Sequence, residues 1–139
     1  MKIIAKENNH YLLRFDAGEE FIAALKTFCE KERIRGATFS ALGAANSVTL
    51  FWYSHSEKSY EERVLREDLE IVNITGNVAM KDAAVIMHAH GVFSGRDFSA
   101  MSGHVKSAVI SVTCEVSLDV FGNSVSRAHN AAFNLNLLD

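Results

Sequence analysis

Three histidines carry the clearest chemical signal in the sequence. His88 and His90 lie two positions apart within an apolar run, and His104 follows 14 positions later, directly after Gly103. In an extended strand, residues two apart point to the same face, with their Cα atoms about 6.6 Å apart. Three neutral imidazoles with an open fourth position are a ligand set typical of a catalytic zinc site. The residue types and spacing therefore indicate a metal site.

A second interpretation of these histidines stays open on the residues alone. A His-x-His pair on a strand can also be two pocket histidines that are satisfied by hydrogen bonds. The third histidine is not fixed by a known ligand spacing. Imidazole ligands suit zinc, nickel, copper and iron alike, and zinc is preferred for its tolerance of four-coordinate sites. We expect the other three histidines, His10, His55 and His129, to be solvated.

The strands that must position the histidines can be recognised from hydrophobic alternation. Residues 85–93 alternate in a way that places His88 and His90 on one face and Ala89, Gly91 and Phe93 on the other. The loop expected over 94–101 would fold the chain back and bring His104 beside this strand. The clearest strand covers 109–120, where Ile110, Val112, Cys114 and Val116 define an apolar face.

Other segments complete an α+β pattern. A helix is expected from Glu19 to about Arg33, because its apolar residues recur at spacings of three and four. Further strands are expected at 11–15, at 39–41 and 48–53 with a break at 43–46, at 72–78 with an interruption at 75–77, and at 133–137. Gly76 in that interruption suggests a bulge or a close backbone approach, and the bulky residues on both faces of 48–53 predict a strand covered on both sides. The charged segment 57–70 is expected to be a solvated edge strand and loop. One helix and about seven strands predict a mostly antiparallel sheet.

Length and charge restrict the function classes. With 139 residues, the chain is predicted to form one domain over 1–139. Fourteen basic against seventeen acidic residues give a net charge of −3, which disfavours direct DNA binding but does not exclude a local basic patch. The sequence contains no G-x-S-x-G elbow, phosphate-binding loop, dinucleotide fingerprint or H-E-x-x-H helix.

Location and redox state follow from other features. Cys29 and Cys114 lie on apolar faces and are expected to be buried free thiols. Residues 36–56 lack charged side chains, but they contain scattered polar residues and alternate, so we expect buried strands there and no membrane span. The N-terminal apolar run ends after three residues, too early for a signal peptide. A cytoplasmic protein is therefore expected.

The order of several short motifs resembles the PPC domain, the plant and prokaryote family. The resemblance covers about residues 10–120. It begins with Tyr11-Leu12-Leu13-Arg14 leading through Gly18-Glu19-Glu20 into a helix. It continues with Leu42-Gly43-Ala44 and Val48-Thr49-Leu50, Leu69-Glu70-Ile71 and Thr75-Gly76-Asn77, and finally His88-x-His90 and Gly103-His104.

The resemblance implies an α+β domain that assembles as a homotrimer. In prokaryotic members it also implies a divalent metal held by the three matching histidines. Plant relatives join the domain to AT-hooks that bind DNA, whereas this chain has no AT-hook. Ser102 stands where the family usually has a second glycine, and no proline precedes the His-x-His strand.

Three functional hypotheses follow. The first is a trimeric metal-binding module with a regulatory or DNA-associated role, acting through partners. The second is a small zinc-type metalloenzyme, a hydrolase or lyase acting on an unidentified small molecule, for which Glu70 and Arg14 in the matching motifs are the candidate base and anion-binding group. The third is a pocket or subunit contact in which the histidines bind no metal.

Overall fold

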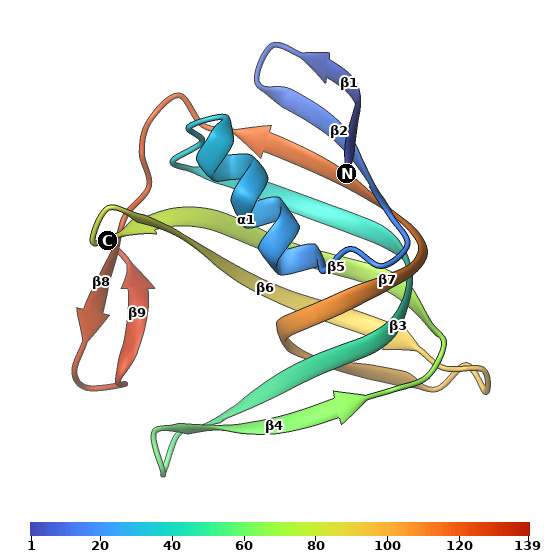
Figure 1. The fold of residues 1–139 in the computed structure, drawn as a ribbon. Helices are drawn as coiled ribbons and strands as arrows, with labels where there is room; N and C mark the ends of the chain where they lie inside the picture. Colours follow the sequence, from blue (N-terminus) through green and yellow to red (C-terminus); the bar gives the residue numbers. More distant parts are fainter.

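In a computed structural model of the protein, residues 1–139 form one helix and nine strands (Figure 1). The helix α1 covers Phe21–Lys31. The strands are β1 (Lys2–Glu7), β2 (His10–Asp16), β3 (Ala37–Ser54), β4 (Ser59–Leu65), β5 (Leu69–Lys81), β6 (Ala84–Ser94), β7 (Ala100–Val120), β8 (Arg127–Asn130) and β9 (Leu135–Leu138).

Seven strands form one antiparallel sheet that folds back on itself. The strand order is β1-β2-β7-β6-β5-β3-β4, and β3 also pairs with β7. The pairings β3–β5, β5–β6, β6–β7 and β7–β3 therefore close a circuit of four strands. Strands β8 and β9 form a separate C-terminal hairpin beside this sheet (Figure 1). The predicted α+β fold with a mostly antiparallel sheet is confirmed.

The two expected strand breaks are absent, although the close backbone approach suggested at Gly76 is confirmed. Strand β3 runs through residues 43–46, because Gly43 has a φ of +154° and β7 passes so close that a Cβ would lie 2.2 Å from the Thr113 carbonyl oxygen. Strand β5 likewise runs through Thr75-Gly76-Asn77, which pair in register with both β3 and β6. Glycine at these positions permits close strand packing and does not end the strand.

Helix α1 is positioned by its cap and its aromatic contacts. The Glu20 side chain accepts hydrogen bonds from the backbone N–H groups of Ile22 and Ala23, which have no partners within the helix. Phe21 packs against Phe15 and Phe39, with ring centroids 5.5 and 5.9 Å away. The buried face also includes Leu25, Phe28 and Cys29, so the helix covers the concave side of the curved sheet (Figure 1).

Burial follows most of the predicted alternation, with two corrections. Ile110, Cys114 and Val116 are buried, as are both cysteines, whereas Val112 on the same expected face is 66% exposed. Register shifts between β7 and β3 around this segment reverse the side that Val112 faces. Trp52 is 64% exposed, so β3 is not covered on both faces there.

Other predictions about the strands differ in extent. The edge strand within 57–70 is confirmed as β4, and the predicted strand 109–120 is the second half of the much longer β7. Strands β1 and β8 were not predicted. Strand β3 makes up most of the 36–56 segment, and no helix has the length and apolar character needed to cross a bilayer.

Candidate metal centre

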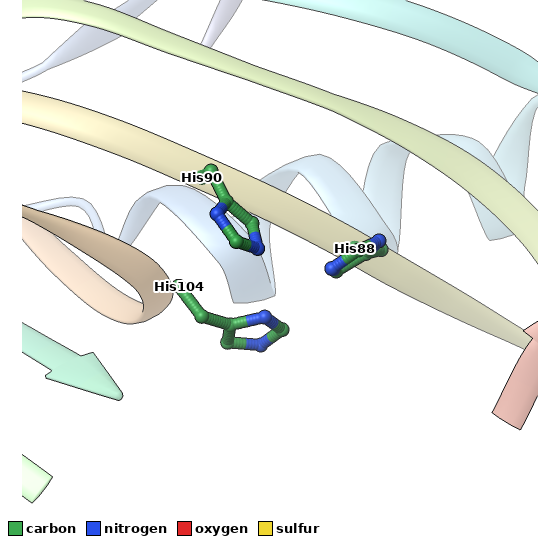
Figure 2. Close-up of side chains that lie close together, drawn as sticks. All are labelled: His88, His90 and His104. Carbon is green, nitrogen blue, oxygen red and sulfur yellow. The ribbon is translucent and has the colours of Figure 1, made fainter. Parts of the chain in front are cut away.

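Strand register brings the three histidines together. His88 and His90 project from the same face of β6, while Ala89, Gly91 and Phe93 on the opposite face are buried in the core. His90 pairs directly with His104 on β7, as expected from the 94–101 connection, which the structure forms as a tight turn between β6 and β7. Figure 2 shows the three side chains converging on a common space.

The geometry suits a metal ion. The candidate ligand atoms of His88, His90 and His104 all lie within 4.8 Å of one another. Ligands on a tetrahedral zinc, at about 2.1 Å from the metal, are separated by about 3.4 Å, so small side-chain rotations would complete the site. His10 is the only histidine whose ring hydrogen bonds to another side chain, Asp119, which leaves the clustered imidazoles available. The donor set therefore fits a divalent transition metal.

Two glycines allow the strands to meet closely at the cluster. A Cβ at Gly76 on β5 would lie 2.3 Å from the His88 carbonyl oxygen, and one at Gly103 would lie 3.0 Å from the Phe51 carbonyl oxygen. Ser102, the departure from the family pattern, lies in regular strand paired with Val92. The serine is therefore accommodated without a change in the strand that carries His104.

Burial and neighbouring charges lower the pKa of two histidines in the cluster. The pKa of His104 is lowered to about 4, first by burial and then by the nearby His88, His90 and Arg127 side chains. The pKa of His88 is also lowered, by burial and then by Arg127 and His90. A metal ion binds neutral imidazole, so these shifts hold two of the three candidate ligands in the required form.

A small cavity opens beside the histidines. It has a volume of about 270 Å³ and lies between the β6–β7 face and the C-terminal hairpin. Phe51 and Tyr60 flank His104, with ring centroids 6.1 and 5.7 Å from the imidazole. The lining residues are Tyr60, Ile86, Met87, His88, His104, Arg127, Asn134, Leu135, Asn136 and Leu137.

Sequence reasoning missed Arg127 and strand β8, although the strand expected at 133–137 corresponds to the other hairpin strand, β9. The Arg127 Nη2 group donates to Asn77 Oδ1 over 2.7 Å, and Nη1 donates to the Asn136 carbonyl oxygen over 2.8 Å. Strand β8 has four residues and no apolar alternation, so no periodic signal marked it. The position of the Arg127 side chain depends on a contact 50 positions away in the chain, which a local pattern cannot reveal.

Glu70 and Arg14 do not line the histidine cavity. Arg14 on β2 binds Asp16, with 2.9 Å between Nη2 and Oδ1. Glu70 on β5 pairs with Ser94 and lines a separate cavity of about 680 Å³ near Arg96 and Phe98. A third cavity, of about 650 Å³, lies beside helix α1 and also contains none of the three histidines.

Comparisons with known proteins place the fold in a family. A protein from Bacteroides thetaiotaomicron described as a putative DNA-binding protein is 30% identical, with 97% of this chain and 94% of that chain covered and a TM-score of 0.94. A metal-containing protein from Archaeoglobus fulgidus is 32% identical, with 99% of both chains covered and a TM-score of 0.87.

A plant- and prokaryote-conserved (PPC) protein from Pyrococcus horikoshii is 26% identical, with 95% and 92% of the two chains covered and a TM-score of 0.89. No curated protein matches the chain. The model of the Plants and Prokaryotes Conserved (PCC) domain matches residues 3–122. This chain therefore belongs to the plant- and prokaryote-conserved domain family, as the order of its motifs predicted.

Proposed function

We propose that this protein binds a divalent metal ion, most readily zinc, through His88, His90 and His104. The observation that carries the proposal is the convergence of three imidazoles whose ligand atoms lie within 4.8 Å of one another. The similarity to a metal-containing protein from Archaeoglobus fulgidus supports it. When bound at an open site, such an ion polarises an oxygen atom or lowers the pKa of a water molecule towards 7.

We further propose a regulatory or DNA-associated role that is exercised through partners. The Bacteroides thetaiotaomicron relative, described as a putative DNA-binding protein, supports this association. The chain itself has a net charge of −3, and two of its lysines, the exposed Lys106 and the half-buried Lys81, are paired with Glu62 and Asp82. A net negative charge opposes the approach of a phosphate backbone, so direct DNA retention should be weak and confined to low salt.

DNA association can be tested by measuring retention on duplex DNA between 25 and 200 mM salt. Counterion release predicts that any retention falls steeply with salt. Absence of binding at the lowest salt would exclude direct contact with DNA. A role through partners then requires that the protein be recovered with a DNA-binding protein from its own cells, and its recovery without one would contradict the proposal.

The alternative is a zinc-type metalloenzyme, and the cavity beside the histidines favours it. Its size and its closeness to two candidate ligands suit a small molecule. Glu70 and Arg14 are the proposed base and anion-binding group, and neither lines this cavity within one chain. Their participation would require another copy of the chain, in keeping with the homotrimer that we propose from the family resemblance.

Metal content is the first experiment. Elemental analysis of untagged protein should find about one zinc per chain, and the His88→Ala/His90→Ala variant should lose it. The His55→Ala/His129→Ala variant removes two histidines outside the cluster and should keep the metal. A metal-free wild type that also resists zinc loading would contradict the proposal. Turnover of ester, phosphoester or lactone substrates that disappears in His104→Ala would establish the enzymatic alternative.

A further inference from the structure

The C-terminal hairpin completes the cavity beside the histidines and lies outside the residues that the family model matches. The family match ends at residue 122, whereas β8 and β9 cover Arg127–Asn130 and Leu135–Leu138. The hairpin is attached to the sheet by hydrogen bonds from the Met80 N–H to the Val125 carbonyl oxygen and from the Tyr53 hydroxyl to the Phe133 carbonyl oxygen. It therefore forms one wall of the cavity.

Arg127 brings an uncompensated positive charge to this wall. None of the ion pairs in the protein includes Arg127. Its two side-chain hydrogen bonds go to neutral oxygens of Asn77 and Asn136, and its buried Nε–H has no acceptor. A guanidinium stays charged in proteins, and a partly buried charge without a counterion is unfavourable. The site therefore favours an anion.

The other lining residues restrict the size and chemistry of that anion. A volume of about 270 Å³ is below the usual range for a drug-sized ligand, so nucleotides and polymers do not fit. Ile86, Leu135 and Leu137 make part of the wall apolar. Arginine binds a carboxylate through two parallel N–H donors. The combination suits a small carboxylate with a short apolar chain.

We propose that the cavity between the histidine cluster and the C-terminal hairpin binds a small carboxylate, with Arg127 as its anion-binding residue. This inference rests on the proposed function, because the other end of the cavity is the proposed metal site. Asn77 is a positioning residue, since its side-chain oxygen holds the guanidinium against β5. The hairpin then acts as part of a ligand-binding site.

The test first measures zinc binding by calorimetry and then titrates acetate, butyrate and inorganic phosphate into the zinc-loaded protein. Butyrate should bind more tightly than acetate because of the apolar wall, and it should shift the ¹⁵N resonance of the Arg127 Nε–H. Arg127→Met should weaken butyrate binding by about tenfold or more, from the loss of charge-assisted hydrogen bonds. Arg127→Lys should also weaken it, because lysine lacks the two-pronged geometry.

Lys106→Met is the matched control, because Lys106 is a cation two positions from His104 that is paired with Glu62 and does not line the cavity. It should leave butyrate binding unchanged. Asn77→Ala keeps the charge of Arg127 and removes one tether, so it should weaken binding less than Arg127→Met does. If Arg127→Met fails to fold its hairpin, Asn77→Ala still tests whether the position of the Arg127 guanidinium affects butyrate binding.

The outcomes separate this inference from the proposed function. Two results would overturn the carboxylate site without contradicting the metal site. One is zinc binding with no shift of the Arg127 Nε–H resonance on addition of butyrate, and the other is equal butyrate affinity in Arg127→Met and the wild type. Phosphate binding more tightly than butyrate would overturn the assignment to carboxylates. Failure of the wild type to bind zinc in the first step would overturn both proposals.

Discussion

At the level of single residues, the histidine cluster places candidate metal ligands beside the positive charge of Arg127. His88 and His104 are kept neutral by burial and by Arg127, so they present lone pairs in an environment that disfavours a proton. Metal ions and protons compete for the same nitrogen atoms. An environment that disfavours protonation therefore favours binding of a metal ion. The same environment makes the folded protein less stable in acid, where the unfolded chain can take up the proton.

The lowered pKa of His104 predicts how the metal-free protein responds to acid. In the unfolded chain this imidazole has its ordinary pKa of 6.5, and in the folded chain the pKa is about 4. Between these values the unfolded state binds a proton that the folded state does not, so stability falls as the pH decreases from about 6.5 to about 4. Above pH 6.5 this contribution is fully present.

Urea unfolding of metal-free protein at several pH values between 4 and 7.5 measures this effect. The wild type should lose stability with falling pH more steeply than His104→Asn, which cannot take up the proton. His129→Asn, outside the cluster, is the control and should follow the wild type. Parallel curves for wild type and His104→Asn would contradict the assigned pKa.

The sequence predicted that His88, His90 and His104 lie close together, but it did not predict that Arg127 lies beside them. Residues two apart on a strand share a face, and a short connection returns His104 to the same strand, so the cluster follows from local rules. Arg127 enters through contacts with Asn77 and Asn136 that depend on how the hairpin packs. Glu70 and Arg14 were chosen as candidate base and anion-binding group because they lie in the matching family motifs. The motifs carry no information on the distance of these residues from the histidines.

At the level of elements, close contact between β5 and β6 should hold His88 in place. A Cβ at Gly76 would meet the His88 carbonyl oxygen at 2.3 Å and the Phe39 ring at 2.6 Å. Gly76→Ala should therefore destabilise the protein by about 1–3 kcal/mol and weaken zinc binding, because β6 must move. Urea unfolding and zinc calorimetry measure the two effects.

The matched control is Gly122→Ala, where a Cβ would meet nothing within 4 Å. This variant should stay within about 0.5 kcal/mol of the wild type and keep its zinc affinity. If Gly76→Ala behaves like this control, the close approach of β5 to β6 does not position the cluster.

One carboxylate, that of Glu20, both caps the helix and bonds to the sheet. Glu20 caps α1 and also accepts a hydrogen bond from the Ala108 N–H on β7, over 2.9 Å. Glu20→Ala should lower the free energy of unfolding by about 1–2 kcal/mol, whereas Glu20→Gln, which keeps an acceptor oxygen, should lose less. Glu30→Ala, at the exposed end of the helix, should be nearly neutral. Chemical denaturation compares the three variants, and equal losses would contradict the capping role.

The extent of the elements was harder to predict than their type. The helix and most strands follow from periodicity, but the strands continue through Gly43 and Gly76, where breaks were expected. At Gly76 the alternative expectation, a close backbone approach, is confirmed. Glycine signals either a turn or a close approach of two backbones, and only the neighbouring strand decides which. Val112 was placed on the wrong face for a related reason, since a bulge changes the alternation without changing residue types.

At the level of the whole molecule, the closed circuit of strands leaves apolar side chains on its outer surface. Leu42 on β3 is 57% exposed and Val72 on β5 is 56% exposed. With Leu12 on β2 they line one shallow cavity of about 230 Å³. Adjacent exposed apolar residues favour contact with another protein surface. This face is therefore the candidate interface of the proposed homotrimer, and substitutions on it can test the assembly.

If three copies meet through this face, a charge placed there should separate them. Burial of a Leu or Val side chain contributes about 1.5–3 kcal/mol, and a buried unpaired carboxylate is strongly unfavourable. The Leu42→Asp/Val72→Asp variant should elute near the 15.3 kDa mass of one chain, whereas the wild type should have three times that mass by light scattering. Ile4→Asp, at an exposed site on β1, should leave the assembly intact. A monomeric wild type would contradict the trimer, and a trimer that tolerates both aspartates would place the interface on another face.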